Sequence, residues 1–186
     1  MSLVDALHEW QGRWRAAGVP DGILLPGVSE AEVRAAIDFA PLHPDAVTWF
    51  GWQNGPATHF TAPPSDREPL GVSHALINRE VLAMLESGRE GGGEFKPSWL
   101  PLLGEAALEC IYMDLETGAI YRRDVGLWSG DSFGVNLRVA DDLESLIRIY
   151  LDVWRIVQPV WVPEDEAFEV DRSLMPDDLF QRHIIG

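Results

Sequence analysis

Cysteine is almost absent from this 186-residue sequence, which contains only Cys110. A single thiol cannot form an internal disulfide bond, and it excludes a structural zinc site built from several cysteines. Cys110 lies beside Ile111, Tyr112 and Met113. In such apolar surroundings we expect it to be a small core residue rather than a nucleophile.

Basic residues are also scarce, since 14 Lys and Arg face 30 Asp and Glu and the formal net charge is -16. A nucleic-acid-binding surface needs clustered basic side chains that neutralise phosphates, so the composition argues against nucleic acid as a partner. A negative field speeds the encounter with a positively charged protein, and we therefore expect a basic protein partner. The alternative is that the surplus acid only keeps the protein in solution.

Long apolar runs are missing as well. No stretch offers the roughly 20 apolar residues of a membrane-spanning helix, and the N-terminal residues lack the basic and apolar segments of a secretory signal. We therefore expect a cytoplasmic protein that does not bind membranes. With 46% hydrophobic and 24% charged residues, the composition is that of a globular protein, and the length suits one domain.

Motifs that carry catalytic or metal-binding chemistry are not found. The five histidines are scattered outside any metal-binding pattern: His8, His43, His59, His74 and His183. Asp114 and Glu116 lie two residues apart, but their position at a predicted hairpin turn favours turn stabilisation over acid-base catalysis. We expect no enzyme activity, no cofactor and no metal ion. An unrecognised hydrolase stays open as an alternative, because catalytic residues need not be contiguous in sequence.

Apolar periodicity predicts two helices near the N-terminus. In residues 3–17 an apolar side chain recurs every three or four positions and forms one helix face: Leu3, Leu7, Trp10 and Trp14. Residues 30–39 form the second predicted helix, because Ser29 and Glu32 occupy capping-box positions in front of an apolar face.

The segment PDAVTWFGWQNGP, residues 44–56, concentrates three aromatic residues in one short stretch. Pro44 suits the first position of a helix, and Gly55 suits the left-handed residue beyond a helix end. Aromatic side chains at helical spacing usually pack in a core, so we expect Trp49 and Phe50 to be buried. Trp52 is the aromatic residue that we expect to reach the surface.

The second half of the chain reads as helix, sheet and helix. We expect a helix over residues 75–88, with an apolar face of Ile77, Val81, Met84 and Leu85, and then a hairpin whose turn is centred on residues 116–118. A short strand and a strongly amphipathic helix over residues 140–157 follow, the helix capped by Asp141 and Glu144. Residues 1–158 then form the domain, and residues 159–186 form an acidic extension with seven acids and two arginines.

The order of these segments resembles the SUKH superfamily, the Smi/Knr-like group. The similarity covers roughly residues 20–157 and rests on the capped helix GVSEAEVRAAIDF, on PDAVTWFGWQNG, on WLPLL, on IYMDLETGAIY and on ADDLESLIRIYLDVW. Its motif residues are Pro44, Trp49, Asn54, Gly55, Trp99, Pro101, Gly118 and Trp154. The chain departs from the family pattern at His43, Ala46 and Pro56, where Leu, Tyr and Gly are usual.

The resemblance implies an α+β domain, in which helices pack around a central, mainly antiparallel β-sheet without a catalytic centre. It also implies a protein-binding module, most often an immunity protein that neutralises a cognate toxin, many of which are nucleases. An intracellular scaffold or regulatory adapter is the alternative within the same group. A basic toxin would suit the acidic charge of this chain.

The candidates for partner contact are acids and one tryptophan in the predicted loops and sheet. They are Asp114, Glu116, Asp124, Trp128, Asp131 and Asp142. Asp141 is a weaker candidate, because helix capping already explains an aspartate at that position.

Overall fold

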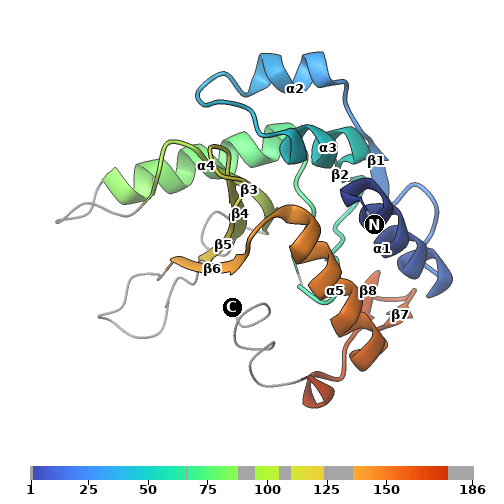
Figure 1. The fold of residues 1–186 in the computed structure, drawn as a ribbon. Helices are drawn as coiled ribbons and strands as arrows, with labels where there is room; N and C mark the ends of the chain where they lie inside the picture. The colour runs from blue at the N-terminus through green and yellow to red at the C-terminus, as the bar shows by residue number, and fades with distance from the viewer. Residues whose placement is uncertain (1, 66, 88–94, 105–109, 124–135, 176–186) are drawn as a thin grey trace.

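The computed structural model describes residues 2–65, 67–87, 95–104, 110–123 and 136–175, and it has an α+β architecture (Figure 1). The helices in these residues are α1 (Leu3–Ala16), α2 (Glu30–Ala36), α3 (Pro44–Trp52), α4 (Val72–Ser87) and α5 (Leu143–Val157), followed by a short 3₁₀ helix (Arg172–Leu174). The strands are β1 (Leu24–Pro26), β2 (Gln53–Pro56), β3 (Trp99–Gly104), β4 (Cys110–Asp114), β5 (Ile120–Arg123), β6 (Asn136–Ala140), β7 (Val160–Val162) and β8 (Ala167–Glu169).

The largest sheet has the strand order β3-β4-β5-β6 and is antiparallel throughout. Helix α4 contacts β3 at one edge, and α5 contacts β6 at the other edge (Figure 1). Two smaller antiparallel pairs, β1-β2 and β7-β8, lie outside this sheet. The predicted fold class is therefore confirmed: helices pack around antiparallel sheets in one compact body.

Aromatic side chains fill the space between α1, α3 and α5. The predicted face of α1 is buried along its whole length, and the ring centroids of Trp10 and Trp14 lie 4.6 Å apart. Trp52 of α3 lies 6.1 Å from Trp10 and 5.9 Å from Trp14, while its own neighbour Trp49 lies 5.4 Å away. Trp49 and Phe50 are fully buried, as predicted, and Trp52 is only partly buried.

Local capping signals place the starts of α2 and α3. Ser29 and Glu32 form the predicted capping box, and Pro44 occupies the first turn of α3. Helix α2 ends at Ala36, three residues before the predicted end, because Ile37 leaves the helical conformation. Gly55 has a positive φ of 89°, as expected, although it lies within β2 and not directly after α3.

The predicted apolar face of α4 is wrong at Ile77 and Met84, while Val81 is partly buried against the core. Ile77 is 55% exposed and Met84 is 65% exposed, whereas Ala75 and Leu82 are fully buried. The contact of the helix with β3 decides which of its sides is buried. At the start of the helix, the side-chain oxygen of Asn54 accepts the backbone N–H of Val72 at 3.0 Å. The buried side of α4 therefore runs through Ala75 and Leu82.

The predicted cap of α5 is displaced by one residue. Asp142, and not Asp141, is the N-cap, and its Oδ1 accepts the backbone N–H of Ser145 at 2.7 Å. The predicted hairpin is present, and the left-handed residue of its turn is Gly118, with a φ of 76°. The motif residues of β3 and α5 are core residues, since Trp99, Pro101 and Trp154 are all buried.

The segment expected to be an acidic extension begins with a hairpin that packs on the domain. Trp161 of β7 is 8% exposed and lies against Phe60 and Phe168, with ring centroids 6.3 Å and 5.2 Å away. Met175 is also buried, beside Val153 of α5. Residues 160–175 thus contribute apolar side chains to the interior.

Candidate functional site

Carboxylates from separate elements gather around the N-terminal ends of α3 and α5. They belong to α3, to the β4-β5 turn, to the β6-α5 connection and to the first turn of α5. We name this group the acidic corner: Asp45, Glu116, Asp141, Asp142 and Glu144. Two of its members, Glu116 and Asp142, are among the residues predicted to contact a partner.

His43 contacts two of the elements that form the acidic corner, α3 and the β4-β5 turn. Its Nδ1 accepts the backbone N–H of Asp45 at 3.2 Å, so the imidazole caps the first turn of α3. On its other side the ring lies against Gly118, where an added Cβ would come within 2.7 Å of Nε2. A side chain at position 118 would therefore collide with His43, and this contact places the β4-β5 turn, with Glu116, beside α3.

The electrostatic environment differs strongly between Asp45 and Asp142. Burial raises the pKa of Asp45, and the nearby carboxylates of Asp142 and Glu144 raise it further, whereas His43 lowers it. The pKa of Asp142 is lowered, chiefly by the hydrogen bonds from Ser145 at the start of α5. The corner therefore keeps Asp142 ionised while it penalises the charge on Asp45.

Arginines neutralise only part of the acidic corner. Arg138 pairs with Asp141 at 2.8 Å, and Arg148 pairs with Glu144. Among the residues that the structure describes, neither Lys nor Arg pairs with Asp45, Glu116 or Asp142. These three carboxylates leave an excess of negative charge at the surface.

Asp114 does not belong to this surface, contrary to the prediction that it is available for partner contact. Its side chain is only 2% exposed, and Oδ1 accepts the Ser98 hydroxyl at 2.9 Å and the Glu116 backbone N–H at 3.1 Å. Lys96 lies 3.6 Å from Oδ2. Asp114 thus organises the β4-β5 turn from inside, while Glu116 points outward. Asp124, Trp128 and Asp131 lie outside the described residues and stay predictions.

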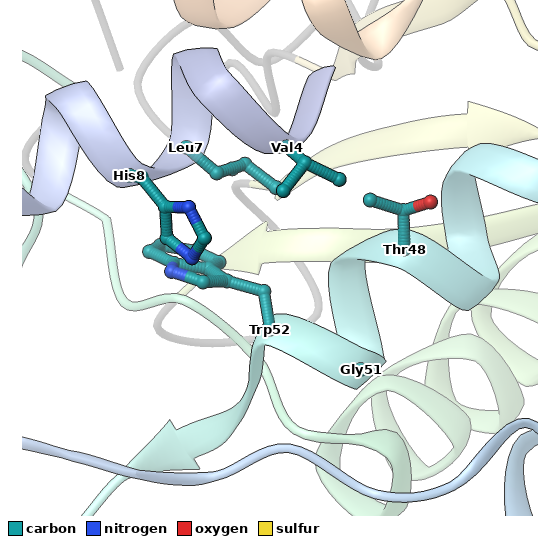
Figure 2. Close-up of a pocket in the computed structure, with 6 residues that line it drawn as sticks. All are labelled: Val4, Leu7, His8, Thr48, Gly51 and Trp52. Carbon is teal, nitrogen blue, oxygen red and sulfur yellow. The ribbon is translucent and has the colours of Figure 1, made fainter. Parts of the chain in front are cut away.

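A pocket of about 350 Å³ opens between α1 and α3 (Figure 2). Its lining residues come from both helices: Val4, Leu7, His8, Thr48, Gly51 and Trp52. The sequence predicts Leu7 as part of an apolar helix face and Trp52 as an aromatic residue that reaches the surface. It gives no signal that α1 and α3 pack side by side, so the pocket between them could not be predicted.

A second group of acids lies on the β7-β8 hairpin, with Glu164, Asp165 and Glu166 in its turn and Glu169 at the end of β8; we name this group the acidic hairpin. All four side chains are exposed. They follow the C-terminal end of α5, so they lie at the opposite end of that helix from the acidic corner. The sequence showed that this segment is acidic, but not that a folded hairpin presents its charges.

The described part of the chain contains no group of three or more His, Cys, Asp or Glu side chains that could hold a metal ion. Within the same residues, no helix is both long and apolar enough to cross a membrane. Comparison with models of known protein families gives no match, and no curated protein matches the chain.

Proposed function

We propose that this chain is a non-catalytic protein-binding module that binds a basic protein through its acidic corner. The observation that carries the proposal is the gathering of carboxylates at one point by the fold. They come from four separate elements, and the charges of Asp142 and Glu144 add to the burial that raises the pKa of Asp45. A cluster of like charges is costly to the free protein, and a positively charged partner would relieve that cost.

The resemblance to the SUKH superfamily supports a toxin as the basic partner. An immunity protein must bind its toxin tightly and quickly, and an acidic surface speeds association with a basic protein. A nuclease toxin is a suitable partner, because a surface that binds phosphates is itself basic. We therefore propose a cytoplasmic immunity protein, with neither cofactor nor metal ion, that neutralises a basic toxin.

The test requires a toxin gene next to the gene for this chain, and its product is purified and also co-expressed in cells. Reversing the charge of Glu116 and Asp141 together, as Glu116→Lys and Asp141→Lys, is expected to lower the association rate by about tenfold at low salt. Protection of the cells should fall in parallel. Added salt should slow the wild-type protein more than this variant, because salt screens the charges that steer the encounter.

Two further variants serve as references. Glu30→Lys changes an exposed acid of α2, which is paired with Arg34 at 2.7 Å and lies outside the acidic corner, and it should leave association unchanged. Asp165→Lys tests the acidic hairpin. A larger loss of association rate for this variant would show that the partner binds at the hairpin and not at the acidic corner. If the neighbouring toxin does not bind, or binds with no dependence on salt, the immunity proposal is wrong and the scaffold alternative takes its place.

A further inference from the structure

We infer that the pocket between α1 and α3 receives an arginine side chain of the basic partner. This inference rests on the proposed function, and it names a specific contact next to the acidic corner. Three features of the described residues support it: the apolar walls of the pocket, a glycine that the fold does not require, and a carboxylate one helical turn away.

The walls suit the apolar stem of a long side chain. Val4 and Leu7 of α1 and Trp52 of α3 supply apolar surface, while His8 and Thr48 are the polar residues of the lining (Figure 2). Trp52 is half-buried within the aromatic core, so its ring is held in place by Trp10, Trp14 and Trp49. A rigid tryptophan in a small pocket is typical of the residues that dominate binding energy at protein interfaces.

Gly51 keeps one wall of the pocket free of a side chain, and no neighbour requires a glycine there. It is the next-to-last residue of helix α3, where glycine costs less than the roughly 1 kcal/mol relative to alanine of a helix interior. An added Cβ would meet only one atom within 4 Å, the Val28 carbonyl oxygen at 3.9 Å, which is an ordinary contact. Gly27 differs, because its Cβ would lie 2.0 Å from the Gly51 carbonyl oxygen. A side chain at position 51 would therefore find room, and the glycine leaves this wall of the pocket open.

The charge near the pocket favours a cation. Asp45 precedes Thr48 by three residues on α3, so the two side chains are neighbours on the helix surface. Asp142 and Glu144 lie close enough to Asp45 to raise its pKa, although Arg148 pairs with Glu144 and offsets part of this charge. Arginine fits better than lysine, since its planar guanidinium stacks on an aromatic ring while its stem fills the apolar space.

Two small probes test the pocket without the partner. Butylguanidinium reproduces the arginine side chain, and butylurea has nearly the same shape without the charge. Binding is followed by NMR at the eight tryptophan indole N–H groups, with Trp52→Phe identifying the Trp52 signal. We expect butylguanidinium to shift that signal with a dissociation constant of about 1 mM. Butylurea should bind about fivefold more weakly.

Leucine substitutions at two helix glycines supply the matched control. Gly51→Leu should fill the pocket and weaken butylguanidinium binding by at least about tenfold. Gly12→Leu places the same side chain on α1, where an added Cβ meets no atom within 4 Å, and it should bind the probe like the wild type. Thr48→Leu narrows the pocket from the same helix and replaces the Gly51 variant if that variant does not fold.

The outcomes separate this inference from the proposed function. Equal binding of both probes would show that charge plays no part and would overturn the assignment to arginine. Absence of a shift at Trp52, or the same binding after Gly51→Leu, would overturn the pocket as a site. If the neighbouring toxin still binds the wild type in either case, the protein-binding module stands and only the arginine contact is lost.

Discussion

At the scale of single residues, the acids of this protein lie in very different environments. Asp114 is buried and hydrogen-bonded, Glu116 is exposed two residues later, and Asp45 is 24% exposed among other carboxylates. Solvation and neighbouring charges decide whether each carboxylate stabilises the fold or opposes it. The same residue type can therefore respond to pH in opposite directions.

Asp45→Asn is expected to raise the melting temperature at pH 7 by about 1–3 °C. The pKa of Asp45 is raised in the folded protein by burial, so the ionised carboxylate opposes folding at pH values above its folded pKa. As the pH falls through that pKa, above the ordinary value of 3.8, the folded protein takes up the proton and the advantage of the variant disappears. Thermal unfolding of both proteins from pH 7 to pH 4 measures this change.

Asp38→Asn controls for the loss of one negative charge from an acidic protein, since Asp38 is exposed. Its effect on the melting temperature should be smaller than that of Asp45→Asn. The backbone N–H of Leu143, at the start of α5, lowers the pKa of Asp45 through a hydrogen bond. A fall in melting temperature for Asp45→Asn at pH 7 would show that this hydrogen bond stabilises the fold more than burial and repulsion oppose it.

At the scale of elements, structure decided within a few residues could be predicted from the sequence. The capping box of Ser29 and Glu32 and the turn at Gly118 involve neighbours in the chain, so their patterns are visible before folding. The buried face of α4 is decided by its packing against β3, a tertiary contact that the periodicity of the helix does not encode, and the prediction for Ile77 is therefore wrong. Glu116 and Asp142 of the acidic corner were predicted from the sequence, but Asp45 joins them only because the fold brings the start of α3 close to the start of α5.

The cap of α5 gives a direct test at this scale. Asp142→Ala removes the side chain that accepts the Ser145 backbone N–H and should cost about 1 kcal/mol of the free energy of unfolding. Asp141→Ala removes an exposed ion pair with Arg138 and should cost less than about 0.5 kcal/mol. Urea unfolding at pH 7 measures both variants. A larger loss of unfolding free energy for Asp141→Ala than for Asp142→Ala would show that Asp141 is the N-cap, as expected from the sequence.

At the scale of the whole molecule, the C-terminal hairpin shows what the sequence pattern could not reveal. Its acids suggested a solvated extension, while Trp161 and Phe168 are only two aromatic residues in a polar segment. Their burial depends on a surface formed by Phe60 and Trp154, which come from other parts of the chain. The pocket between α1 and α3 was hidden for the same reason, because its walls meet only in the folded protein.

Trp161→Ala is expected to lower the free energy of unfolding by about 3 kcal/mol, as for a tryptophan of the core. Trp49→Ala, which removes a fully buried ring, is the reference and should cost about 3–5 kcal/mol. Chemical unfolding followed by far-ultraviolet circular dichroism compares the two variants with the wild type. Unchanged stability of Trp161→Ala would mean that residues 159–175 are a separable extension.

The aromatic packing between α1 and α3 also has an optical consequence. Trp10, Trp14 and Trp49 each lie within 6.1 Å of Trp52, measured between ring centroids. At such separations the electronic transitions of indole rings couple, so excitation absorbed by one ring passes readily to the others. Among these four rings, only Trp52 lines the pocket. A molecule that binds there and quenches the fluorescence of Trp52 should therefore also reduce the fluorescence excited through the other three rings.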